Sequence, residues 1–110
     1  MQTSSLTGLA ERHLALAHQA SSGLSAQTVY GGHASTLRQT VIPLAAGKQL
    51  DEHENPGEAT LLVLRGSVRV SAGDDTGDAS AGELIVIPDA RHRLQALQDA
   101  VVLLTVAKIG

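Results

Sequence analysis

From Leu24 onward, the chain is a succession of short apolar runs separated by turn residues. Glycine, proline, asparagine and aspartate interrupt these runs at fairly regular spacing. Such a pattern is typical of an antiparallel sandwich or barrel rather than of a parallel βαβ sheet. We therefore expect an all-β, antiparallel jelly-roll barrel. Its strands are expected at residues 26–30, 36–44, 49–53, 59–64, 67–72, 84–87, 92–97 and 101–107.

The first 23 residues follow a different periodicity. Apolar side chains recur there at three- and four-residue spacings, which places them on one face of a helix. Ser4 or Ser5 is suited to cap this helix, and Gly23 to end it. We expect one N-terminal α-helix within residues 1–23, packed on a barrel made of residues 24–110. The apolar positions of the helix are Leu6, Leu9, Ala10, Leu16, Ala17 and Ala20.

Composition restricts the kinds of ligand. The 110 residues predict one domain with one core, and with no Trp, no Phe and only Tyr30 as an aromatic residue, aliphatic side chains must fill it. A pocket without aromatic rings argues against dedicated recognition of sugars or nucleobases by stacking. The net charge of -3 and the lack of a basic stripe argue against nucleic-acid binding.

The sequence gives no sign of membrane insertion or secretion. Its apolar runs are far shorter than the roughly 20 residues that span a bilayer. The N-terminus lacks the basic segment of a secretory signal, so we expect a soluble, cytoplasmic protein. The chain has no cysteine, which excludes disulfides and thiolate metal sites.

Two segments carry a histidine at the edge of an apolar strand. The first begins at Gly47, has His53 after a five-residue spacer, and closes at Gly66. The second runs from Gly82 through Pro88 to His92. These segments resemble the paired motifs of the cupin family, and the resemblance covers roughly residues 36–108. The first family motif has two histidines in a His-x-His arrangement, whereas this chain has Asn55 in the second position. The second motif is one residue short and has Ala90 where the family has glycine.

The resemblance implies a cupin barrel in which His53 and His92 meet in one pocket. Two imidazoles and a carboxylate suit a divalent transition metal such as Zn, Ni, Fe or Mn, with open positions for a small-molecule ligand. The candidate metal ligands are His53, Asn55, Glu58 and His92. Asn55 has two interpretations: a pocket residue that orients a ligand or a water, or the first residue of a turn.

The carboxylate ligand depends on the register of the strand that follows. Counting along the family motif places Ala59 at the ligand position, which leaves the site one ligand short. If residues 55–58 form a two-residue hairpin loop, Glu58 instead lies beside His53. After Glu58, both faces of the expected strand carry apolar residues, so the periodicity of the sequence does not decide between these registers.

Polar residues outside the two motifs are expected to be structural or solvated. His13 and His18 are interpreted as packing or solvated helix residues. Arg38 is expected at the surface or at a strand edge, because an inward arginine is costly unless a carboxylate or an anionic ligand pairs with it. The acidic residues of one turn are expected to form a solvated hairpin tip, since they lack calcium-loop spacing; they are Asp74, Asp75 and Asp78.

The main functional hypothesis is a small cupin-domain protein whose degenerate histidine pocket binds a divalent metal, with no further molecular role assigned. The alternative is a metal-dependent cupin enzyme, an oxygenase or isomerase acting on a small organic molecule. A third hypothesis is a structural role with a solidly packed barrel. No catalytic residue is assigned. The resemblance also implies a homodimer, and the apolar run at residues 101–104 favours one because it is too continuous for a strand exposed on one face.

Overall fold

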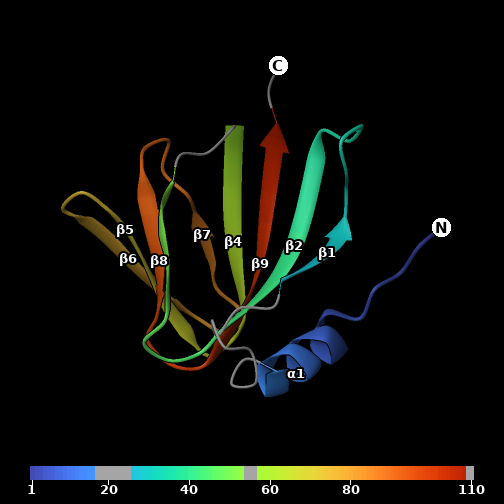
Figure 1. The fold of residues 1–110 in the computed structure, drawn as a ribbon, viewed down its shortest axis with the longest axis horizontal. Coiled ribbons are helices and arrows are strands. Elements are labelled where there is room, and N and C mark those ends of the chain that lie inside the picture. The colour runs from blue at the N-terminus through green and yellow to red at the C-terminus, as the bar shows by residue number, and fades with distance from the viewer. Residues whose placement is uncertain (17–25, 54–56, 109–110) are drawn as a thin grey trace.

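The structure is a computed structural model that describes residues 1–16, 26–53 and 57–108. It contains one helix followed by nine strands within these ranges. The expected all-β architecture with one N-terminal α-helix is confirmed (Figure 1). The elements are α1 (Leu6–Leu16), β1 (Gln27–Tyr30), β2 (Leu37–Leu44), β3 (Gln49–His53), β4 (Gly57–Arg65), β5 (Ser67–Ala72), β6 (Asp75–Ser80), β7 (Leu84–Val86), β8 (His92–Ala96) and β9 (Ala100–Lys108).

The strands form two antiparallel sheets. One has the order β1-β2-β9-β4-β7 and the other has the order β3-β8-β5-β6. After β2 the chain passes between the sheets at almost every connection, and only β5 and β6 are consecutive strands of one sheet. This alternation is the antiparallel jelly roll expected from the sequence. It brings strands that are far apart along the chain, such as β2 and β9, into direct pairing.

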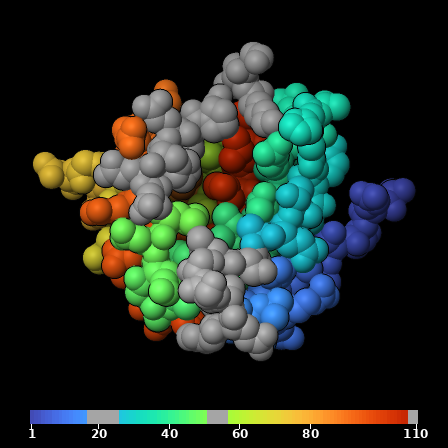
Figure 2. All heavy atoms as spheres, in the orientation of Figure 1, coloured from blue at the N-terminus to red at the C-terminus, as the bar shows by residue number. Residues whose placement is uncertain are grey.

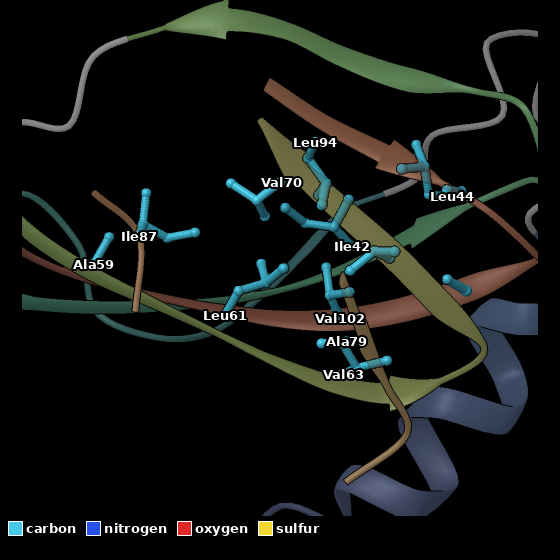
Figure 3. Close-up of a cluster of buried hydrophobic side chains, with 13 residues drawn as sticks. Ile42, Leu44, Ala59, Leu61, Val63, Val70, Ala79, Ile87, Leu94 and Val102 are labelled. Atoms are coloured by element: carbon cyan, nitrogen blue, oxygen red, sulfur yellow. The ribbon is translucent and has the colours of Figure 1, made fainter. Parts of the chain in front are cut away.

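The inner faces of the two sheets enclose an aliphatic core (Figure 3). Leu44, Val63, Val68 and Val102 have no exposed surface, which places the most tightly packed part of the core around them. Burying such side chains is the main stabilising term for a domain of this size. The buried members of this inner cluster are Ile42, Leu44, Ala59, Leu61, Val63, Val68, Val70, Ala79, Ile87, Leu94, Ala96, Ala100 and Val102.

Helix α1 covers part of the outer face of the five-stranded sheet (Figure 1). Ala10 packs there against Val41, Val101 and Leu103 in a second apolar cluster. The backbone N–H of Gly8 donates to Ser5 Oγ at 3.1 Å, so Ser5 caps the helix as expected. The predicted helix end at Gly23 lies outside the described residues, as do Ala17, His18 and Ala20. No helix of the described chain has the length and apolar character to cross a membrane.

The helix also explains the continuous apolar run at residues 101–104. Val101 and Leu103 face α1, whereas Val102 and Leu104 face the inner cluster. Both faces of this part of β9 are therefore covered within one chain. The run no longer supports a homodimer, and the dimer stays a prediction.

Strand β6 was not expected from the sequence. Asp75 and Asp78 belong to this strand rather than to a hairpin tip, although both are exposed as predicted. Arg69 on β5 donates to both carboxylate oxygens of Asp78, at 2.8 and 3.0 Å. Ala79 is the buried residue of β6, so the strand contributes little to the core and carries little apolar signal in its sequence.

Candidate functional site

The two motif histidines meet at one end of the barrel. His53 at the end of β3 pairs with His92 at the start of β8. Three residues link β3 to β4, so the start of β4 lies at this same end. We call this end the mouth: it is formed by the starts of β2, β4 and β8 and by the ends of β3 and β9. The predicted meeting of these two histidine positions is thus found in the backbone register.

A bulge in β3 produces this pairing. Leu50 pairs with Leu94 and His53 pairs with His92, so three steps along β3 match two steps along β8. The extra residue interrupts the regular alternation of positions along β3 between Leu50 and His53. Bulges re-aim side chains at the ends of strands, which is why simple counting fails at this position. Asn55 lies outside the described residues, and its two interpretations stay predictions.

His92 is enclosed and its ring is oriented. Only 4% of its surface is exposed, and it shares the inner face of β8 with Leu94. Its Nδ1 donates to the carbonyl oxygen of Ala90 at 3.0 Å. Because a carbonyl can only accept, Nδ1 carries the proton and the lone pair of the neutral ring lies on Nε2. Metal-binding histidines in proteins are commonly held in this way through their second nitrogen.

The structure places Ala59 inside the barrel and Glu58 outside it. Ala59 is 4% exposed and belongs to the inner cluster, followed on the same face by Leu61 and Val63. Glu58 is exposed and pairs with Ala107 of β9 on the opposite face. The register that would set Glu58 beside His53 inside the barrel is therefore not the one adopted. Both faces of β4 are apolar because α1 covers part of the outer one, which is why the sequence left this question open.

The described residues do not complete a metal site by themselves. Among residues 1–16, 26–50 and 57–107, whose side chains the structure describes, no three histidine, aspartate, glutamate or cysteine side chains are grouped as they would need to be to hold a metal ion. His92 fits a ligand role by its burial and ring orientation. With Ala59 in the family's acidic position, the histidine pair lacks an inward carboxylate from β4. Strong binding in protein metal sites usually takes three or four ligands.

Arg38 lies on the inner face of β2, which corrects the expectation that it is a surface or edge residue. Its partner on β9 is Val106, which also pairs with Ala59 of β4. Ala59 belongs to the inner cluster and Val106 packs against it, so this face of the sheet is the inner one. Two residues farther along β2, Thr40 shares this face and pairs with Leu104. The signal in the sequence was the even spacing from Arg38 through Thr40 to Ile42. It could be used only once Ile42 was known to face inward.

The inner wall is open to solvent toward the mouth. At the closed end, the inward side chains of Leu44 and Val102 have no exposed surface. Toward the mouth, the inward residues Arg38, Thr40 and Leu104 are partly exposed. Figure 2 shows a hollow in this region, where atoms of β9 (red) lie behind those of β2 (teal). The interior is therefore packed solid at one end and accessible at the other.

A second depression lies at the edge of the mouth between β4 and β7. Its volume is about 380 Å³, and its lining includes Glu58, Val86, Ile87 and Asp89. Glu58 lines this depression together with Ala59 and Ile87 of the inner cluster.

Comparison with known proteins gives matches among solved structures alone. No protein-family model matches the sequence, and no curated protein matches it. A conserved protein of unknown function from Streptococcus pyogenes matches with a TM-score of 0.73 and 26% identity, over 83% of this chain and 79% of that chain. An RmlC-like cupin protein from Desulfovibrio desulfuricans matches with a TM-score of 0.66 and 26% identity, over 76% and 81% of the two chains.

A more distant match shows the same fold. A cupin-2 domain containing protein from Shewanella frigidimarina is 16% identical, with a TM-score of 0.64 over 76% of this chain and 80% of that one. The two-sheet jelly roll, the paired histidine positions at the mouth and these matches agree with one another. The chain has the fold of a small cupin domain.

Proposed function

We propose that this cupin domain is a binding module whose mouth takes a small molecule, and that His53 and His92 bind a divalent transition metal weakly there. The observation that carries the proposal is the pairing of these histidines at the accessible end of the barrel. The orientation of the His92 ring supports it, because the bond from Nδ1 to the Ala90 carbonyl fixes the ring in the way that is common for metal-binding histidines.

Weak binding follows from the number of ligands. Two imidazoles leave most of the coordination positions of Zn, Ni, Fe or Mn to water or to a bound small molecule. Such an ion would supply a Lewis-acidic contact for that molecule. The chain's own residues hold the ring of His92 and line the cavity with aliphatic side chains. The enzyme alternative, an oxygenase or isomerase, stays a prediction.

Metal titration of tag-free, chelator-treated protein tests the proposal. We expect Zn²⁺, Ni²⁺ or Co²⁺ to raise the melting temperature, because an ion that binds the folded state alone stabilises it. His53→Gln and His92→Gln should each lower the affinity by about tenfold or more, since each removes half of the proposed protein ligands. Calorimetry gives the affinities.

The matched control is His33→Gln, which changes an exposed histidine outside the two motifs. This variant should bind metal as the wild type does. Two results would contradict the proposal: no metal binding by the wild type, or an affinity that neither motif variant changes. Because His92 is buried, circular dichroism of each variant is needed to show that it is folded before its affinity is compared.

A further inference from the structure

We propose that Arg38 is an anion anchor inside the barrel and that the mouth binds a small aliphatic carboxylate. The carboxylate would lie on the Arg38 guanidinium, and the hydrocarbon part would lie against the inner wall. This proposal specifies the class of small molecule that the mouth binds, and it therefore rests on the binding role given under the proposed function. It does not require a metal at the histidine pair.

The position of Arg38 follows from an uninterrupted register. Strands β2 and β9 pair without a bulge from Leu37 to Leu44, so Arg38, Thr40 and Ile42 all lie on one face of β2. Ile42 belongs to the inner cluster, and that face is therefore the inner one. Arg38 is four residues closer to the mouth than Ile42, or about 13 Å along the strand. It therefore lies on the inner wall near the opening.

The charge of Arg38 has no partner in the part of the chain that the structure describes. Two arginines on outer surfaces do have partners: Arg65 contacts Glu11 at 3.0 Å and Arg69 contacts Asp78 at 2.8 Å. An inward, partly buried guanidinium without a counter-charge is unfavourable, because it loses hydration without gaining a hydrogen bond. A carboxylate that enters the mouth would supply two parallel hydrogen bonds in the geometry that guanidinium matches best.

The walls indicate what the rest of the ligand is like. Leu61, Leu104 and Val106 line or pack against the inner cluster near Arg38, and Thr40 adds one hydroxyl on the same strand. The chain has no Phe or Trp, so the wall suits a branched aliphatic body rather than a stacked ring. One guanidinium also matches a monocarboxylate better than a phosphate dianion, which usually takes more than one cationic or backbone donor.

The test uses chelator-treated protein and 4-methylpentanoate as the probe. We expect saturable binding at millimolar concentrations, seen as NMR shifts of inner-wall residues and by calorimetry. Arg38→Gln should weaken the binding by about tenfold or more, the usual range for a lost charge-assisted hydrogen bond. Arg38→Lys, which keeps the charge but loses the planar fork, should bind with intermediate affinity.

Arg93→Gln is the matched control. Arg93 is an exposed arginine next to His92 on β8, but it lies on the outer face, where it pairs with Ser71. This variant should bind the probe as the wild type does, and 4-methylpentan-1-ol, which has the same body without the charge, should bind far more weakly.

Any of four results would overturn the inference. These are no saturable binding by the wild type, unchanged binding by Arg38→Gln, equal binding of the alcohol, or tighter binding of inorganic phosphate than of the carboxylate. Since no metal is present, loss of metal binding in the histidine variants leaves this outcome unaffected. The failure of one proposal can therefore be distinguished from the failure of the other.

Discussion

His13 is a buried histidine of α1, and only one of its two ring nitrogens has a hydrogen-bond partner. It is 4% exposed, and its Nε2 donates to Gln27 Oε1 at 2.8 Å. Its Nδ1 is buried and has no hydrogen-bond partner. A buried polar atom without a partner lowers the free energy of unfolding. The single hydrogen bond to Gln27 limits this penalty for the ring at the contact between helix and sheet. The packing role predicted for His13 is consistent with this placement.

A double-mutant cycle on this pair measures the contribution of the bond. Gln27→Leu leaves both ring nitrogens of His13 without a partner and should lower the free energy of unfolding by about 1–2 kcal/mol. In the His13→Leu background the same change should have little effect, because no buried nitrogen is left unpaired. Urea unfolding of the four proteins gives the coupling energy. Additive effects of the two substitutions would contradict this account of the pair.

Residue positions on strands were the hardest features to predict from sequence. The choice between Glu58 and Ala59 required knowing which face of β4 is inward, and α1 makes both faces apolar. The inner-face position of Arg38 required the register of β2 with β9. The motif spacing indicated that His53 and His92 come together, and the backbone register pairs these two positions despite the bulge in β3. Strict alternation along β3 does not predict this pairing, because the bulge shifts the register between Leu50 and His53.

At the scale of single elements, β5 and β6 form a polar hairpin at one edge of the four-stranded sheet. The hydrogen bonds from Arg69 lower the pKa of the Asp78 carboxyl, and those to Asp78 raise the pKa of Arg69. A depressed carboxyl pKa stabilises the folded state above the ordinary aspartate value of about 4, and this contribution is lost as the pH falls through the folded pKa. The pair is exposed, so its effect on stability is small and screened by salt.

Carboxyl titration by NMR tests this assignment. In the wild type, Asp78 should titrate below the ordinary aspartate range, because the guanidinium favours its charged form. In Arg69→Gln the pKa of the Asp78 carboxyl should return toward that range. An ordinary pKa for Asp78 in the wild type would show that the ion pair is not maintained in solution.

Elements with a strong apolar pattern were predicted well, and the polar one was missed. Strands β3 and β5 have the expected bounds, and most other strands differ by a residue or two. Strand β6 escaped detection because its sequence, Asp-Thr-Gly-Asp-Ala-Ser, has one buried side chain and reads as a turn. Its pairing comes from its neighbour β5, which a single segment does not reveal. The closing motif glycine, Gly66, has a φ of 75°, and a Cβ there would collide with the Asp99 carbonyl.

At the scale of the whole molecule, the chain divides its apolar residues between two clusters. The inner cluster closes one end of the barrel, and the outer cluster holds α1 against the five-stranded sheet. This second cluster accounts for the apolar run of β9 without a second chain. The outer face near β7, in contrast, carries exposed apolar side chains. Leu84 and Val86 on this edge strand are 58% and 73% exposed, and they share a face with Leu62.

The predicted homodimer can be tested at that edge. In the described structure β7 pairs with β4 alone, so its other side is available to a strand of a second copy. If β7 lies in the interface, Val86→Lys should weaken association by about tenfold or more, because it places a charge in an apolar contact. Leu97→Lys is the control, since Leu97 is also exposed but follows β8 at the closed end. Light scattering and sedimentation at micromolar concentration measure the mass. A monomeric wild type would contradict the homodimer, whereas a dimer unaffected by Val86→Lys would place its interface away from β7.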